Sequence, residues 1–261
     1  MDGAGIWKGI KSDPCVYYSF QTDRGGPTMP GAKELTPAQE RILVESEKVL
    51  GKKGISGLEL KNVAKVLKVA PSTINYYYAS SEDLIFDTAL FSYNKYVQRI
   101  VNEAEGFSDP EKVLRIWIKN TFDWTKELPG IGVILEFPRQ VIKSNSKVPK
   151  KSEELLKNFS RTASETGIRN VTFLCSAIRS VQKNQNFRLY KPAQIAVFIA
   201  KDSTYATFCS TIGFATLGGG LWVAGRQPES KSNPAWRNFG FNQQKQMQDS
   251  ITGIIKLLKN P

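Results

Sequence analysis

A series of closely spaced helix start signals runs through residues 36–84 and constrains the fold more than any other feature of the chain. Thr36 and Gln39 fit a capping box, and Pro37 stands at the first helical position, where its missing N–H group costs nothing. Apolar residues follow with helical spacing, and Gly54 supplies a C-terminal stop. The segment therefore predicts a first helix that ends beside Gly54.

Two more start signals follow within the same segment. Ser56 and Glu59 fit a second capping box, ahead of a short helix over residues 60–67. Ser80 and Asp83 fit the cap of a later and longer helix. The short helix has an apolar face made by Leu60, Val63, Ala64 and Leu67. The longer helix has an apolar stripe made by Leu84, Ile85, Leu90 and Ile100.

Between these two helices, Pro71 marks the start of a third helix, which residues 72–77 fill. We expect Val69 and Ile74 to pack this helix against the first two. Helices in this order form a helix-turn-helix unit, which lays one helix in the major groove of DNA. The alternative interpretation is a helical pair inside an ordinary core.

The segment also resembles the DNA-binding domain of TetR-family transcriptional repressors in its residues. The family's Ile-Ala pair, Gly-Val-Ser turn, Thr-Leu-Tyr-Tyr-His-Phe helix and Ser-Lys-Glu-x-Leu start correspond here to Val63-Ala64, Lys68–Ala70, Thr73–Tyr78 and Ser80–Leu84. Three positions depart from the family. Asn75 replaces a Tyr that contacts the DNA backbone, and Ser81 and Glu59 replace a Lys and a Thr that contact phosphates.

The resemblance implies that the third helix reads DNA while neighbouring lysines add salt-sensitive attraction to the backbone. Asn75 suits a bidentate pair with adenine, and the tyrosine hydroxyls suit phosphates. The predicted DNA-binding residues are Lys61, Lys65, Lys68, Pro71, Ser72, Thr73, Asn75, Tyr76, Tyr77 and Ser81.

Helix breakers organise the rest of the chain, and no strand pattern competes with them. Further helices are expected at residues 110–127, 131–142, 152–184 (where Gly167 favours an interruption), 192–217 and 241–259. The predicted fold class is all-α, with a helix-turn-helix domain at 34–80 and an effector-binding and dimerisation bundle at 81–261. Residues 1–33 are a disordered tail or an arm that contacts DNA, and residues 218–240 are a loop-rich insertion.

In TetR-family proteins the last long helices join two subunits, and the middle helices enclose an effector pocket. The resemblance therefore implies a homodimer formed through residues 192–217 and 241–259. A dimer also has a physical reason, because one short helix reads few base pairs. The candidate pocket residues, which are equally typical of an apolar core, are Trp117, Phe122, Trp124, Phe137, Phe173, Tyr205 and Phe208.

Charge and hydropathy are also compatible with a second class of function. The chain has a net charge of +12, and this excess falls on residues 140–261. It indicates a solvated basic face, or attraction to an anionic effector, nucleic acid or a membrane surface. Residues 203–225 carry no charge, but their Ser, Thr and Gly content favours a buried helix and turn over stable membrane insertion. The alternative function is a basic, helical membrane-surface or lipid-binding protein.

The residue types that most enzymes and metal sites need are scarce. The chain has no histidine, which excludes Ser-His-Asp and Cys-His catalysis, and no Cys-x-x-Cys pair for zinc. The three cysteines, Cys15, Cys175 and Cys209, are far apart in the sequence, and so small and odd a number fits a protein of the reducing cytoplasm. Cys175 and Cys209 suit core positions better than a redox sensor. No phosphate-binding loop, dinucleotide fingerprint or signal peptide is present.

These observations predict a cytoplasmic transcriptional regulator without catalytic residues, metal or cofactor. The resemblance implies that it binds double-stranded DNA as a dimer and responds to a small-molecule effector. The sequence is compatible with repression and with activation, and the resemblance favours repression.

Overall fold

The computed structural model describes residues 35–128, 130–136, 138–142 and 150–195, and the short pieces 252–253, 255–256 and 258–259 near the C-terminus. Every element in this described part is a helix, which confirms the predicted all-α class. The elements are α1 (Pro37–Gly57), α2 (Leu60–Leu67), α3 (Pro71–Tyr77), α4 (Ser81–Ala104), α5 (Pro110–Glu127), α6 (Ile131–Glu136), the 3₁₀ helix η2 (Pro138–Gln140) and α7 (Lys150–Gln182).

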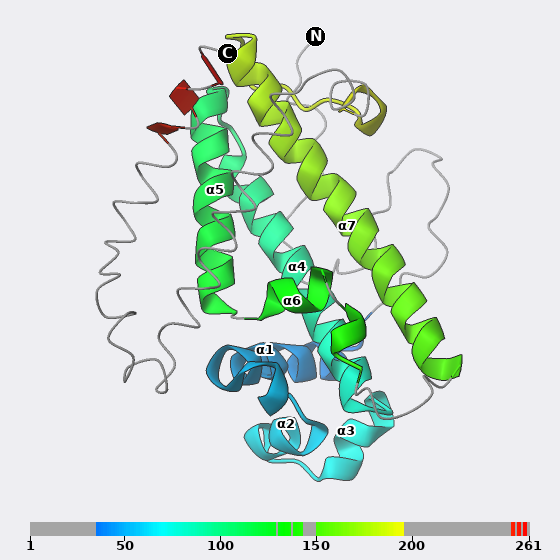
Figure 1. The fold of residues 1–261 in the computed structure, drawn as a ribbon. Coiled ribbons are helices and arrows are strands. Elements are labelled where there is room, and N and C mark those ends of the chain that lie inside the picture. The colour runs from blue at the N-terminus through cyan, green and yellow to red at the C-terminus, as the bar shows by residue number, and fades with distance from the viewer. Residues whose placement is uncertain are drawn as a thin grey trace, which may run out of the picture.

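The helices form two groups joined by α4 (Figure 1). At the lower end of Figure 1, α1 packs on α2, and α2 packs on α3. We call these helices the three-helix unit. Above it, α4, α5 and α7 pack on one another to form the bundle, and α6 lies against α4. Because α1 also packs on α4, the three-helix unit is attached to the bundle by these contacts as well as by the chain connection.

The predicted start of α1 is confirmed in detail. The Gln39 backbone N–H donates to Thr36 Oγ1 at 3.3 Å, and the Thr36 N–H donates to Gln39 Oε1 at 3.1 Å, which completes the capping box. Gly54 has φ +68°, a left-handed conformation that stops the regular helix, as predicted. One more turn follows Gly54, so that α1 ends at Gly57.

The predicted capping box of α2 is wrong. Ser56 lies in the extra turn of α1, and Glu59 is itself the N-cap residue, whose side chain makes no capping bond. The reason lies outside the local sequence. Leu58 is buried in the core and the chain reverses after Gly57, so Ser56 lies before the reversal and does not cap α2, which begins at Leu60 as predicted. Asn62 compensates in part, because its Nδ2 donates to the Gly57 carbonyl oxygen at 2.8 Å.

The prediction that Val69 anchors α3 is also wrong. Val69 is 36% exposed, whereas Ile74 is fully buried and holds α3 as expected. The backbone of Val69 instead closes α2, since its N–H donates to the Ala64 carbonyl oxygen at 3.0 Å. Lys68 precedes it with φ +57°, and this left-handed residue turns the Val69 side chain outward.

α4 and α5 begin where the sequence predicts. Ser80 caps α4, because its Oγ accepts from the Asp83 N–H at 3.1 Å. Asp109 caps α5 in the same way, accepting from the Glu111 N–H at 2.9 Å. The predicted apolar stripe of α4 is buried at Leu84, Ile85, Leu90 and Ile100.

The helices after α5 differ from the prediction. The expected helix over residues 131–142 ends at Glu136 and continues as η2, which begins at Pro138. The interruption expected at Gly167 is absent, because α7 runs unbroken from Lys150 to Gln182. Gly167 sits beside Tyr93, whose hydroxyl lies 3.6 Å from the position of an added Cβ.

Most of the regions assigned to dimerisation lie outside the described residues, as do residues 1–33 and 218–240. Within the segments predicted as helices, residues 192–195 and the three short pieces near the C-terminus are helical. Ile255 and Leu258 are buried in the main core, which supports an amphipathic C-terminal helix.

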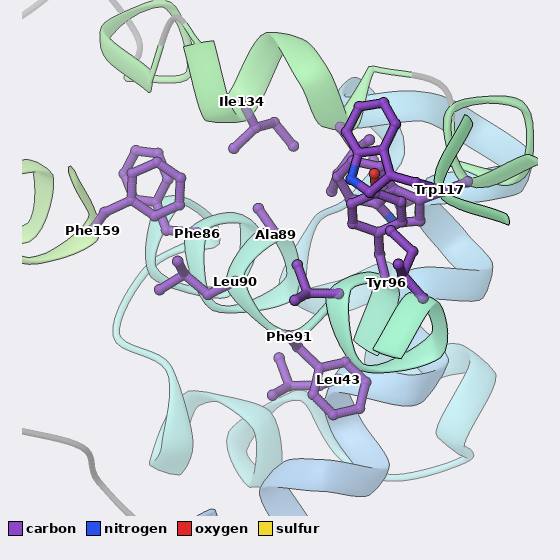
Figure 2. Close-up of a cluster of buried hydrophobic side chains, with 14 of the residues drawn as sticks. Leu43, Phe86, Ala89, Leu90, Phe91, Tyr96, Trp117, Ile134 and Phe159 are labelled. Atoms are coloured by element: carbon purple, nitrogen blue, oxygen red, sulfur yellow. The ribbon is translucent and has the colours of Figure 1, made fainter. Parts of the chain in front are cut away.

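The hydrophobic core is continuous from the three-helix unit into the bundle. Figure 2 shows Leu43 of α1 near Phe91 of α4, and Phe86 beside Phe159 of α7, with ring centroids 4.6 Å apart. Cys175 is fully buried, as expected of a small core residue. Across the described residues, no helix has the length and apolar character needed to cross a bilayer.

Candidate nucleic-acid interface

α3 is a short helix with almost all of its side chains outside the core. Ile74 is the one buried residue in α3, and it is fully enclosed. Tyr77 is half-buried, and Tyr78, just after the helix, is buried and ends it. The exposed residues of α3 are Pro71, Ser72, Thr73, Asn75 and Tyr76. A helix attached along a single narrow line leaves its outer face free to contact another molecule.

Tyr76 is the most prominent side chain of this face. It is 83% exposed, although an aromatic ring of this size ordinarily loses most of its surface in a monomer. Its ring contacts Tyr77 edge-to-face, with the centroids 5.0 Å apart. The two rings therefore lie side by side directly after Asn75 in the sequence.

The predicted lysines lie on α2 and on the turn that leads into α3. Lys61, Lys65 and Lys68 are all exposed. Lys61 Nζ lies 2.8 Å from Glu59 Oε2, and this hydrogen bond raises the pKa of the lysine. Glu59 therefore offsets part of the positive charge at the start of α2 and leaves Lys65 and Lys68 as the more available cations.

Helix packing brings the ten predicted residues to one end of the molecule (Figure 1). α2 packs on α3, and Ser81, which is half-buried, opens α4 only four residues after α3 ends at Tyr77. α2 and α3 lie at the end of the molecule furthest from the C-terminal end of α7. The elements that carry the predicted DNA-binding residues therefore lie at one end of the molecule.

Two apolar residues here were not predicted to be exposed. Val66 of α2 is 47% exposed, and Val69, in the turn between α2 and α3, is 36% exposed. The helical spacing of α2 contained the signal for Val66, because this residue lies off the face formed by Val63 and Ala64. Exposed aliphatic groups of this kind can contact thymine methyl groups in the major groove.

The candidate pocket residues that the structure describes are mostly packed against other side chains. Trp117 is buried and its Nε1 donates to Asn170 Oδ1 at 2.9 Å. Trp124 is buried and stacks on Tyr96, with centroids 4.5 Å apart. Phe173 is buried against Phe187, and Phe122 is half-buried. Phe137, Tyr205 and Phe208 lie outside the described residues.

Polar groups surround these aromatic side chains between α4, α5 and α7. Tyr96 bonds through its hydroxyl to Thr121, and burial raises the pKa of the Tyr96 phenol. Asn94 Oδ1 accepts from Thr166 Oγ1 at 3.1 Å and from Arg169 Nη2 at 2.7 Å. Sequence periodicity did not reveal this layer, since its members come from three separate helices.

Comparisons with known proteins support the fold. No protein-family model matches the chain, and no curated protein matches its sequence. Among solved structures, the fatty acid degradation regulator FadR from Bacillus halodurans is similar over 87% of this chain and 96% of its own, with 14% identity and a TM-score of 0.51.

Two other solved structures align less closely. The transcriptional regulator FadR from Bacillus subtilis in complex with stearoyl-CoA covers 85% of this chain and 97% of its own, with 13% identity and a TM-score of 0.47. The TetR-family regulator PfmR from Thermus thermophilus covers 71% and 96%, with 18% identity and a TM-score of 0.42.

The likeness to the Bacillus halodurans protein extends over nearly the full length of that regulator. The chain thus has the all-helical fold of that solved regulator, in agreement with the fold class that the sequence predicts.

Proposed function

We propose that this protein is a DNA-binding transcriptional regulator that places α3 in the major groove. The observation that carries the proposal is the exposure of α3, which buries Ile74 alone and presents polar and aromatic side chains beside exposed lysines. A short helix that exposes most of its side chains in this way suits the role of the recognition helix of a helix-turn-helix protein, which lies in the major groove.

The exposed residues divide into base-reading and backbone-binding groups. Ser72, Thr73 and Asn75 are short and polar, and they suit base edges, with Asn75 positioned for an adenine. The hydroxyl groups of Tyr76 and Tyr77 suit phosphates, which fix the register of the helix on the duplex. The lysines of α2 and the turn supply the salt-sensitive part of the affinity.

We further propose that two copies bind a palindromic operator together. A single α3 offers a handful of contacts, and a second copy one helical turn away, about 34 Å, supplies the missing affinity and specificity. A small-molecule effector bound among the bundle helices then favours another spacing of the two units and releases DNA. Such a shift requires that the effector binds the two states with different affinity.

The test uses the full-length protein and a duplex enriched on it from a random library. Fluorescence anisotropy of the labelled duplex measures the dissociation constant. Replacing both Tyr76 and Tyr77 by alanine should weaken binding about ten-fold or more, since a hydrogen bond to a charged group such as a phosphate contributes about 1.5–3 kcal/mol. Phe107→Ala is the control, because Phe107 is exposed in the loop after α4, away from α3. Equal affinity of the double variant and the native chain would show that α3 is not the DNA-reading helix.

A further inference from the structure

The side chains of α3 belong to a narrow range of chemical types. Between Leu60 and Ala79 the sequence contains no arginine, glutamine, aspartate or glutamate, and α3 itself carries no charged residue. In the major groove, arginine and lysine read guanine, and acidic side chains accept from cytosine. α3 therefore lacks the charged groups that most often recognise a G·C pair.

The polar side chains of α3 are compatible with an A·T pair. Asn75 is exposed, and the amide of an asparagine can bond to the N6 and N7 atoms of adenine. The paired thymine shows a C5 methyl group in the major groove, which no other base carries there and which apolar groups contact. An interface that reads A·T pairs therefore needs exposed methyl groups as well as an amide.

Exposed apolar groups are present at the N-terminal end of α3. Val69 is 36% exposed, although valine is most often buried, and it stands two residues before the first residue of α3. Ala70, Pro71 and Thr73 are exposed as well. The N-terminal residues of a recognition helix are the ones that contact base edges. Methyl groups therefore occupy the part of α3 that would approach the bases.

The charge beside these methyl groups favours DNA over an apolar protein surface as their partner. Lys68 directly precedes Val69, Lys65 lies in the last turn of α2, and both lysines are exposed. A protein that covered the methyl groups would also take the ammonium groups out of water, which is costly. In DNA, phosphates that attract lysine line the groove whose floor carries the thymine methyl groups.

We propose that the turn before α3 and α3 itself recognise a half-site made of A·T pairs. In it, the methyl groups of Val69 and Thr73 pack on the C5 methyl groups of thymine, and Asn75 bonds to adenine. The proposal rests on the DNA-binding function proposed above and names the class of sequence that this function recognises. The lysines lie outside α3 and contact phosphates, so the half-site needs no guanine.

Deoxyuridine tests the methyl contacts directly. It lacks the C5 methyl group of thymidine and keeps the same base pair. Each thymine of the duplex enriched on the full-length protein is replaced singly, and fluorescence anisotropy measures the dissociation constant. We expect replacement of a contacted thymine to weaken native binding about four-fold, the factor that corresponds to burial of one methyl-sized apolar group.

Two variants assign the contacts to residues. Val69→Ala removes two methyl groups from an exposed position, and Thr73→Ser removes one methyl group while keeping the hydroxyl. Each variant should bind the thymine duplex more weakly than the native chain and should lose the response to deoxyuridine at the position that its residue contacts. Val133→Ala is the matched control, because Val133 is an exposed valine of α6, outside the three-helix unit, and this variant should keep the native response. Circular dichroism checks that every variant is folded.

The same titrations separate this proposal from the DNA-binding function. If the native chain binds the enriched duplex and deoxyuridine has no effect at any position, or the same effect in the native chain and in both variants, the methyl contacts are wrong while DNA binding stands. One variant that keeps the native response removes its own residue from the contact. An enriched half-site made of G·C pairs also overturns the proposal. If no duplex is enriched or bound, the DNA-binding function fails, and this proposal fails with it.

Discussion

Lys68 adopts a backbone conformation that side-chain-bearing residues rarely take. It ends α2 with φ +57° and ψ +41°, a position where glycine is the usual residue. The side chain is exposed on the turn between α2 and α3, so packing does not compensate for the strain. Retention of a lysine here is consistent with a charge that serves the proposed contact with phosphates.

We predict that Lys68→Gly raises the free energy of unfolding by about 1 kcal/mol, because it relieves the left-handed strain. The same change should weaken DNA binding and reduce the slope of log K against log[salt] by about 1, since one phosphate contact is lost. Urea denaturation and salt-dependent anisotropy measure the two effects.

Asn184→Gly is the control for this prediction, since Asn184 also has a positive φ, +48°, at the end of α7. Asparagine tolerates this conformation, so the gain in stability should be smaller, and DNA affinity should not change. A Lys68→Gly protein with unchanged DNA affinity would remove Lys68 from the proposed interface.

Glu47 makes a prediction about pH. Burial raises the pKa of its carboxyl group above the ordinary 4.5, so folding favours the protonated form. The contribution of the Glu47 carboxyl to the free energy of unfolding is therefore present at low pH and is lost as the pH rises through the folded-state pKa. We therefore predict that Glu47→Gln gains stability relative to the native chain between pH 4 and pH 7.

Urea denaturation at both pH values checks this difference, and Glu45→Gln gives the comparison for an acidic residue whose side chain is more exposed, at 21%. A difference in unfolding free energy between Glu47→Gln and the native chain that stays constant across this pH range would show that the Glu47 carboxyl titrates normally.

At the scale of helices, the sequence predicted the elements whose starts are encoded by adjacent residues. The capping groups of α1, α4 and α5 lie within three residues of the groups that they bind, and all three appear as expected. The cap of α2 was misassigned because burial of Leu58, a tertiary effect, outweighed the local signal at Ser56, although α2 begins at Leu60 as predicted. The direction of Val69 depended on the φ angle of Lys68, which the residue type does not encode.

The features of the candidate site likewise divide into those that a single sequence segment predicts and those that depend on contacts between helices. The sequence predicted that Ile74 holds α3, and the resemblance implied that most of its other residues face outward to DNA. The polar connections of Trp117 and Trp124 join residues on different helices, and their partners Asn170 and Ser92 have no sequence signal of their own. Contacts between separate elements required the structure.

Gly167 tests whether α7 needs its glycine. The residue lies inside a continuous helix, and an added Cβ would meet the Tyr93 hydroxyl at 3.6 Å, an ordinary contact distance. We predict that Gly167→Ala raises the free energy of unfolding by about 0.5–1 kcal/mol through helix propensity. Urea denaturation measures the change.

Gly54→Ala is the matched contrast. An alanine Cβ there would meet nothing within 4 Å, yet the backbone has φ +68°, so this variant should lose stability. If Gly167→Ala also loses stability, α7 and α4 are packed more tightly beside Tyr93 than the structure indicates.

At the scale of the molecule, the continuous core has consequences for unfolding and for regulation. Ile42 and Leu43 of α1 belong to the same buried cluster as Leu114 of α5 and Ile178 of α7. A three-helix unit that shares its core with the bundle cannot reorient as a freely jointed domain. A change inside the bundle is therefore transmitted through packed side chains that have a small number of arrangements.

The shared core predicts that the three-helix unit and the bundle unfold together. Leu43 is fully buried in α1, and Figure 2 shows it near Phe91 of α4. Leu43→Ala should lower the free energy of unfolding by about 2–5 kcal/mol, because it removes buried methyl groups and leaves a cavity. Since the core is continuous, the loss should appear equally in both parts of the molecule.

Hydrogen exchange of the slowest amides in α1, α5 and α7 measures each part separately. Val66→Ala, on an exposed side chain of α2, should leave all of these rates nearly unchanged. Faster exchange confined to α1, α2 and α3 would show instead that the unit opens by itself, and the core would then no longer account for communication with the bundle.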